Sequence, residues 1–109
     1  PIFLDEFKSE YVGLCYDSSH DFVQGQSSGD ILDNYKDRLF CVHLSDCDGI
    51  SDKHWTPGKG IVNWKRIIKV IKNTDCKSFS METYPSDEEK NLTAKDFLYK
   101  AKDSLIKVL

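Results

Sequence analysis

The sequence predicts an α/β fold in which three parallel strands share one sheet and helices connect them. Short apolar runs rich in β-branched and aromatic residues alternate with segments of helical periodicity. The resulting order, β-α-β-α-β-α, is typical of parallel strands joined by right-handed crossovers. The chain has 109 residues, 39% of them hydrophobic, which is enough for one domain with one modest core.

The expected strands are the three apolar runs. They cover residues 11–17, 39–45 and 78–84. The expected helices cover residues 27–39, 63–72 and 93–109. Ser28 and Asn63 are suited to cap the first two helices. Thr93 and Asp96 have the spacing of a capping box at the start of the third.

Charge and cysteine content narrow the function classes. The formal net charge of −3 disfavours nucleic acid as the main ligand, because proteins that grip phosphate backbones are usually basic. No apolar run reaches membrane-spanning length and no signal-peptide pattern is present. The four cysteines form no C-x-x-C pair, which favours free thiols and a cytoplasmic location. Cys15, Cys41 and Cys76 lie in or beside apolar runs, so we expect them to be buried.

Each expected strand carries a metal-capable residue near its carboxyl end, namely Asp17, His43 and Glu82. Because these ends lie on the same side of a parallel sheet, two carboxylates and one imidazole can converge on one divalent cation. Each residue also has a structural interpretation: a turn cap, a hydrogen-bonded core histidine and an internal salt bridge, respectively. The coincidence across three strands favours a metal site over these alternatives.

A long connection, residues 46–62, leaves the carboxyl end of the second strand, where α/β proteins place their sites. Asp52 and His54 lie on it, and His20 follows Asp17 by three residues. These three side chains are candidates for a second metal or for hydrogen bonds to substrate hydroxyls, with a solvated loop as the alternative. Asp46 is expected to support His43 or the loop.

Other motifs in this connection are incomplete. DCDG resembles the start of a calcium loop, but its glycine, Gly49, is at the wrong position and no glutamate closes the loop. PGKG lacks the upstream glycine and the Ser or Thr of a phosphate loop. We expect Asp48 to face solvent, and Gly58 and Gly60 to let the backbone pass close to a ligand.

Several stretches together resemble the xylose isomerase-like TIM-barrel superfamily, most closely its sugar phosphate isomerase/epimerase members. They are VGLCYDSSH, GDILDNYKDRLFCVHLSDCDG, DKHWTPGKGIVNW and SMETYP. The resemblance implies that residues 1–109 are a single partial domain, the C-terminal part of a (β/α)8 barrel with its sixth, seventh and eighth strands. The N-terminal strands are expected to be missing.

The resemblance also implies an activity: proton transfer next to the carbonyl of a sugar or sugar phosphate. Asp17, His43 and Glu82 match the family's metal ligands, and Glu82 also matches an acid/base residue. The cofactor would be Mn²⁺, with Co²⁺, Zn²⁺ and Mg²⁺ also compatible with the donor set. The family's fourth ligand, a glutamate, would fall before Pro1, so we expect the chain by itself to be inactive.

Two alternatives stay open. By resemblance to endonuclease IV, His20 would bind a second metal, and Asp52 and His54 match that nuclease's additional zinc ligands. The activity would then be metal-dependent cleavage of abasic DNA. Otherwise the chain is a non-catalytic fragment that self-associates through an unpaired sheet edge. In the isomerase interpretation, His20 and His54 would bind hydroxyls and Trp55 would line the pocket.

Overall fold

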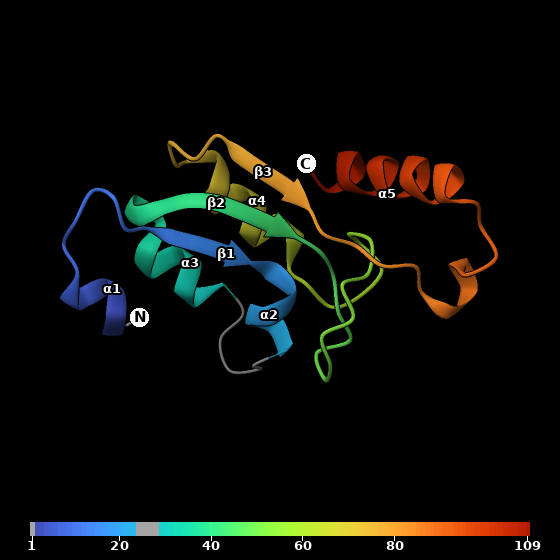
Figure 1. The fold of residues 1–109 in the computed structure, drawn as a ribbon, viewed down its shortest axis with the longest axis horizontal. Helices are drawn as coiled ribbons and strands as arrows, with labels where there is room; N and C mark the ends of the chain where they lie inside the picture. Colours follow the sequence, from blue (N-terminus) through green and yellow to red (C-terminus); the bar gives the residue numbers. More distant parts are fainter. Residues whose placement is uncertain (1, 24–28) are drawn as a thin grey trace.

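The computed structural model describes residues 2–23 and 29–109, and Figure 1 shows a twisted sheet with helices against one face. The strands are β1 (Leu14–Asp17), β2 (Leu39–Leu44) and β3 (Ser78–Met81). They form one sheet in the order β1-β2-β3, and both pairings are parallel. The predicted α/β fold with three parallel strands is therefore confirmed.

The helices and 3₁₀ turns account for most of the remaining described residues. They are α1 (Ile2–Glu6), α2 (Ser18–Val23), α3 (Asp30–Tyr35), η1 (Lys36–Arg38), α4 (Trp64–Lys72), η2 (Asp87–Glu89) and α5 (Ala94–Val108). Asn63 caps α4 by accepting from the Arg66 amide at 3.1 Å. Thr93 caps α5 by accepting from the Asp96 amide at 3.2 Å. The expected cap Ser28 lies outside the described residues. In the part of the chain that is described, no helix is both long and apolar enough to cross a bilayer.

The start of β1 differs from the sequence prediction because Arg38 ties down the segment before it. Its guanidinium donates to the carbonyls of Leu4 at 2.6 Å and Phe7 at 2.8 Å, and also to that of Val12. These bonds keep the backbone before Leu14 out of the sheet, so β1 begins three residues later than position 11.

Side-chain alternation gives the sheet two different faces. Tyr16, Val42 and Leu44 are nearly inaccessible to solvent and pack into the core with the apolar stripes of α3 and α4. On the other face Cys15 is exposed and Cys41 is half-buried. The expectation that these two cysteines are buried was wrong, because alternation directs them to the face that these helices do not cover. Cys76 is buried as expected.

Glu89 forms a buried ionic cluster between η2 and α5. Its side chain accepts from the backbone and hydroxyl of Ser86 and pairs with Lys59 at 3.2 Å and Lys100 at 2.9 Å. Burial alone would raise the pKa of Glu89, but the bonds from Lys100, Ser86 and Lys59 outweigh it and lower the pKa to about 2. The cluster thus stabilises the connection from β3 to α5.

Candidate metal centre

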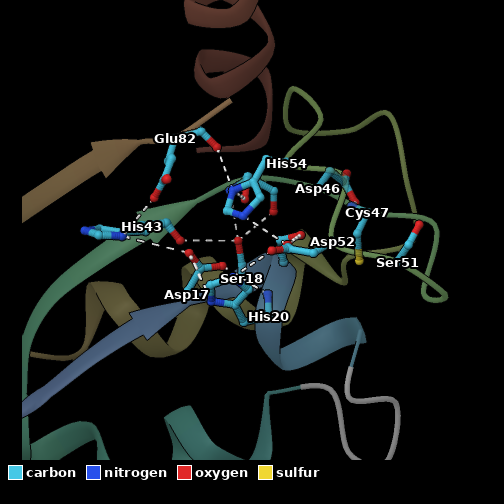
Figure 2. Close-up of polar contacts among 12 residues, drawn as sticks. Asp17, Ser18, His20, His43, Asp46, Cys47, Ser51, Asp52, His54 and Glu82 are labelled. Atoms are coloured by element: carbon cyan, nitrogen blue, oxygen red, sulfur yellow. Dashed lines mark hydrogen bonds and ion pairs between the residues drawn. The ribbon is translucent and has the colours of Figure 1, made fainter. Parts of the chain in front are cut away.

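The three strand ends bring Asp17, His43 and Glu82 together, as Figure 2 shows. One ligand atom from each lies within 4.8 Å of the others. His43 Nδ1 is 3.9 Å from Asp17 Oδ2 and 3.3 Å from Glu82 Oε2. The side chain of Asp17 is 10% exposed, whereas those of His43 and Glu82 are 38% and 46% exposed. The group is therefore closed on the Asp17 side and open on the Glu82 side.

Backbone register and two serines explain this convergence. Asp17 and His43 are direct partners in the β1–β2 ladder. Just beyond, the buried Ser18 hydroxyl donates to the Ser45 carbonyl at 2.7 Å and accepts from the Ser45 amide at 3.0 Å. This pair of bonds joins the ends of the two strands, so their last side chains are held side by side.

Asp17 combines a structural contact with an unsatisfied oxygen. Its Oδ1 accepts from the His20 amide at 3.0 Å, which is the turn-cap role that the sequence left open. Its Oδ2 is buried and has no hydrogen-bond partner among the described residues. A buried carboxylate oxygen without a partner is costly, and a bound cation would compensate for it. The residues present therefore fit a divalent cation ligated by Asp17, His43 and Glu82.

The second group of candidates lies directly beside the first. Asp52 is in its centre: Oδ2 is 2.8 Å from His20 Nε2, and Oδ1 is 3.0 Å from His54 Nε2. Ser19 also donates to Oδ1 at 2.9 Å. Burial would raise the pKa of Asp52, but the bonds from Ser19, His20 and His54 lower it below its usual range. This group is an ordered hydrogen-bonded cluster, which argues against the alternative of a freely solvated loop.

His54 is buried and has a strained backbone. Its φ is +47°, in the left-handed region that non-glycine residues seldom adopt. Nδ1 lies 3.1 Å from the Glu82 carbonyl oxygen, which can only accept, so Nδ1 carries the hydrogen. Burial lowers the pKa of His54, yet the bonds to the Glu82 carbonyl and to Asp52 raise it overall. His54 therefore links the loop to the end of β3.

Ser45, His54 and Asp52 resemble a catalytic triad in connectivity only. Ser45 Oγ is 3.1 Å from His54 Nδ1, and His54 Nε2 faces Asp52. However, Ser45 is completely buried, and the nitrogen that faces its hydroxyl already carries a hydrogen. A nucleophilic serine needs both an accessible hydroxyl and a base that can accept its proton. We therefore interpret Ser45 as structural; its spacing in the sequence did not single it out.

Asp46 supports the loop and not His43. It is completely buried, and its carboxylate accepts four hydrogen bonds of 2.9–3.0 Å. The donors are the amides of Cys47, Gly58 and Val62 and the indole of Trp64. Its backbone also forms an antiparallel bridge with Trp55. The sequence allowed Asp46 to support either His43 or the loop, and in the structure it supports the loop.

Two further expectations for this loop need correction. A Cβ on Gly60 would lie 2.0 Å from the Cys47 carbonyl oxygen, so the close approach at Gly60 is to the protein's own backbone and not to a ligand. Asp48 is partly buried and accepts from the amides of Ile50 at 2.9 Å and Ser51 at 2.8 Å. It closes a turn instead of simply facing solvent.

Trp55 borders a hollow of about 330 Å³. The other residues that line this hollow are Lys59, Ser86, Asp87 and Glu88. The expectation that Trp55 lines the substrate pocket stays a prediction.

The fold and the residues at its strand ends agree with a family match. The model of the xylose isomerase-like TIM barrel family matches residues 3–101, and the chain belongs to this family. The sheet of three parallel strands is accordingly interpreted as part of a barrel.

Two known proteins are similar to the chain over different lengths. A crystal structure of a D-tagatose 3-epimerase-like protein superposes with a TM-score of 0.71 at 18% identity, covering 96% of this chain and 37% of that chain. The uncharacterized protein y4fM of Sinorhizobium fredii is 35% identical over 69 residues, which are 63% of this chain and 22% of that protein. The chain thus spans well under half the length of either relative. At 18% identity the structural match establishes the fold alone.

Proposed function

We propose that the chain supplies three ligands of a divalent-cation site in a sugar or sugar-phosphate isomerase or epimerase. The observation that carries the proposal is the convergence of Asp17, His43 and Glu82 at the carboxyl ends of three parallel strands. Barrel enzymes of this kind place their chemistry at that end. Membership of the xylose isomerase-like family and the likeness to a D-tagatose 3-epimerase-like protein support the same reaction class.

The donor set suits Mn²⁺ first, with Co²⁺, Zn²⁺ and Mg²⁺ compatible. When bound, such a cation supplies Lewis-acid polarisation of a substrate carbonyl. Glu82 is nearly half exposed, so its carboxylate can reach a substrate and take a proton from the carbon beside the carbonyl. His43 Nδ1 lies 3.3 Å from Glu82 Oε2, so both side chains would hold the same cation. The partner that returns the proton would lie on another segment of the barrel.

The second polar group would position the substrate. His20 has a side chain that is 56% exposed and is anchored by Asp52, so it can offer a hydrogen bond to a hydroxyl. His54 is only 6% exposed and has both ring nitrogens engaged. We therefore propose that His54 acts indirectly, by holding Asp52 and the backbone carbonyl of Glu82.

The test uses the full-length protein with Mn²⁺ on a panel of ketoses and ketose phosphates. Glu82→Gln should lower kcat by roughly 10²–10⁴-fold, the usual contribution of a general base. Loss of exchange between the substrate C–H and solvent deuterium should accompany it. The control is Glu10→Gln, an exposed carboxylate before β1, which should leave the rate unchanged. Wild-type turnover in Glu82→Gln would remove the role assigned to Glu82.

Metal binding is tested separately from turnover. Asp17→Asn should weaken Mn²⁺ binding, measured by calorimetry, by roughly tenfold or more, which corresponds to about 1.4 kcal/mol. Glu10→Gln again serves as the control. Unchanged Mn²⁺ affinity in Asp17→Asn would contradict the ligand assignment, whatever the activity of the protein.

A metal-dependent phosphodiesterase acting on abasic DNA is the second candidate. One observation favours it: Asp17, His20 and His54 also present ligand atoms within 4.8 Å of one another, so the strand ends could hold more than one cation. The net charge of −3 weighs against a DNA-tracking surface. Cleavage of an abasic-site oligonucleotide by the full-length protein, abolished by His54→Ala, would favour this candidate over the isomerase.

We also propose that the isolated chain self-associates. In the described sheet only β2 has a strand on both sides, and the large side chain of Phe79 on β3 is 50% exposed. Unpaired strand edges and exposed apolar surface favour association. Light scattering of the isolated chain should give a mass above 12.5 kDa. A monomer with a cooperative melt would contradict the proposal.

A further inference from the structure

The hydroxyl of Ser19 is buried against the second polar group, that of His20, Asp52 and His54, and has no part in the function proposed above. Ser19 lies in the first turn of α2 and is completely buried. Its Oγ donates to Asp52 Oδ1 at 2.9 Å. A hydrogen bond to a carboxylate is roughly twice as strong as a neutral one. The contact therefore ties the loop of residues 46–62 to α2, and it needs no other segment of the barrel to form.

Asp52 passes this restraint on to His20, as Figure 2 shows. Asp52 Oδ2 lies 2.8 Å from His20 Nε2. A carboxylate oxygen can only accept, so Nε2 of His20 carries a hydrogen. Asp52 Oδ1 is held from the other side by Ser19 and by His54 Nε2 at 3.0 Å. The orientation of the carboxylate is thus fixed, and with it the direction from which His20 donates.

His20 is also held at its backbone, so its second ring nitrogen has a defined place. The His20 amide donates to Asp17 Oδ1 at 3.0 Å. Nδ1 lies 3.7 Å from Asp17 Oδ2, the buried oxygen without a hydrogen-bond partner among the described residues. Nδ1 therefore faces the place where the strand-end ligands converge. With the hydrogen on Nε2, the neutral ring presents a lone pair at Nδ1.

We propose that Ser19 is a positioning residue that holds Asp52, which in turn fixes His20 in the tautomer with its hydrogen on Nε2. The inference rests on the function proposed above, in which His20 meets a substrate hydroxyl. It adds the direction of that hydrogen bond: the substrate hydroxyl donates and Nδ1 accepts. An ether or carbonyl oxygen at the same place has no hydrogen to donate, so the site selects substrates with a free hydroxyl there.

The other two buried serines at the strand ends show how Ser19 differs from a structural hydroxyl. The Ser18 hydroxyl bonds only to backbone groups, the carbonyls of His43 and Ser45 and the amide of Ser45. The Ser45 hydroxyl faces the nitrogen of His54 that already carries a hydrogen. Of these three serines, Ser19 alone reaches a carboxylate that contacts a candidate substrate-binding side chain.

The first test reads the tautomer directly and does not depend on activity. Ring nitrogens and ring hydrogens are correlated by NMR in the ¹⁵N-labelled full-length protein above about pH 8, because a tautomer is defined only for a neutral ring. His20→Gln identifies the signals of His20. The unmodified protein should show the hydrogen on Nε2, whereas Asp52→Ala should show both tautomers. A hydrogen on Nδ1 in the unmodified protein would overturn the proposal.

The same spectra test Ser19 itself through the exchange of the Nε2 hydrogen of His20 with solvent. Ser19→Ala should speed this exchange by roughly tenfold, because a less firmly held Asp52 protects the hydrogen less. The matched control is Ser51→Ala, which removes a hydroxyl from the same loop that contacts Asp48 and not Asp52. Equal exchange rates in Ser19→Ala and Ser51→Ala would overturn the positioning role.

The second test is a double-mutant cycle in kcat/KM with the substrate that is active on the ketose panel. Asp52→Ala should lower kcat/KM by roughly 10²-fold and Ser19→Ala by roughly tenfold, the usual range for residues that orient a functional side chain. Since Ser19 acts through Asp52, adding Ser19→Ala to Asp52→Ala should lower kcat/KM by less than about twofold more. Additive effects would overturn the proposal. If no ketose is turned over, the proposed function fails, while the NMR results still decide the role of Ser19.

Discussion

The buried carboxylate of Asp46 offers the sharpest test of how the site loop is stabilised. Asp46→Asn keeps the size of the side chain but replaces one carboxylate oxygen by an NH₂ group. Oδ1 accepts from Cys47 and Val62, and Oδ2 accepts from Gly58 and Trp64. Whichever oxygen is replaced, the new NH₂ faces two N–H donors that lose their acceptor, and at least one of the two is buried.

The magnitude follows from the cost of those donors. A buried donor without an acceptor costs about 1–3 kcal/mol, and the two remaining bonds lose their charge assistance. Water that enters the loop recovers part of this, so we expect Asp46→Asn to lower the free energy of unfolding by about 2–4 kcal/mol. Asp48→Asn is the matched control. Asparagine also closes turns, so it should change the free energy of unfolding by less than about 0.5 kcal/mol.

The assay is urea denaturation of the full-length protein, with far-ultraviolet circular dichroism as the signal. The free energy of unfolding of each variant is compared with that of the unmodified protein. The comparison requires that the slope of this free energy against urea concentration is the same for both. Trp64→Phe, which removes one of the four donors but no acceptor, should cost less than Asp46→Asn. A loss below about 1 kcal/mol in Asp46→Asn would refute the reasoning, because at least one buried donor must then have found another acceptor.

Three further predictions concern the backbone, the ionic cluster and the last helix. Gly60→Ala should lower the free energy of unfolding by about 3 kcal/mol, because its Cβ would overlap the Cys47 carbonyl. Gly58→Ala should lower it by about 1 kcal/mol, because φ is +86° at that position. The opposite order in urea denaturation would contradict this prediction. The pKa of Glu89 is lowered from 4.5 to about 2, so its stabilisation is complete above pH 4.5 and is lost as the pH falls towards 2. From about pH 5 to about pH 3 the unmodified protein should therefore lose about 2 kcal/mol more than Glu89→Gln, and parallel pH profiles would refute the assignment. Thr93→Ala should cost about 1 kcal/mol through loss of the α5 cap, with Thr93→Ser close to neutral in the same denaturation assay.

The sheet was predictable from the sequence because its signals are local. Apolar runs identified β1, β2 and β3. Parallel strands align their carboxyl ends, and this rule alone predicted that Asp17, His43 and Glu82 lie close together. The predicted ends of the strands were less accurate where a distant side chain binds the backbone. Arg38 does so before β1, where it donates to backbone carbonyls. Helix α2 was not predicted, because six residues are too few to show a helical period.

The loop around the site was less predictable because its shape depends on contacts between distant residues. His20, Asp52 and His54 were singled out as separate candidates. Their arrangement around Asp52 depends on the left-handed backbone of His54 and on the bridge from Asp46 to Trp55. Neither feature leaves a periodic pattern in the sequence. The same limit applies to Cys15 and Cys41, whose exposure depends on which face of the sheet the helices cover.

The backbone bridge between Asp46 and Trp55 has a consequence for protein engineering. Its two hydrogen bonds, of 2.7 and 2.8 Å, close residues 47–54 into a loop whose ends meet. Asp46 then anchors the chain beyond the bridge through Gly58, Val62 and Trp64. Residues 48–53 can therefore be exchanged as a cassette, while Cys47, which is buried in the core, and His54, which is bonded to the Glu82 carbonyl, are kept. A library of such cassettes would vary what the strand ends recognise and leave the underlying scaffold intact.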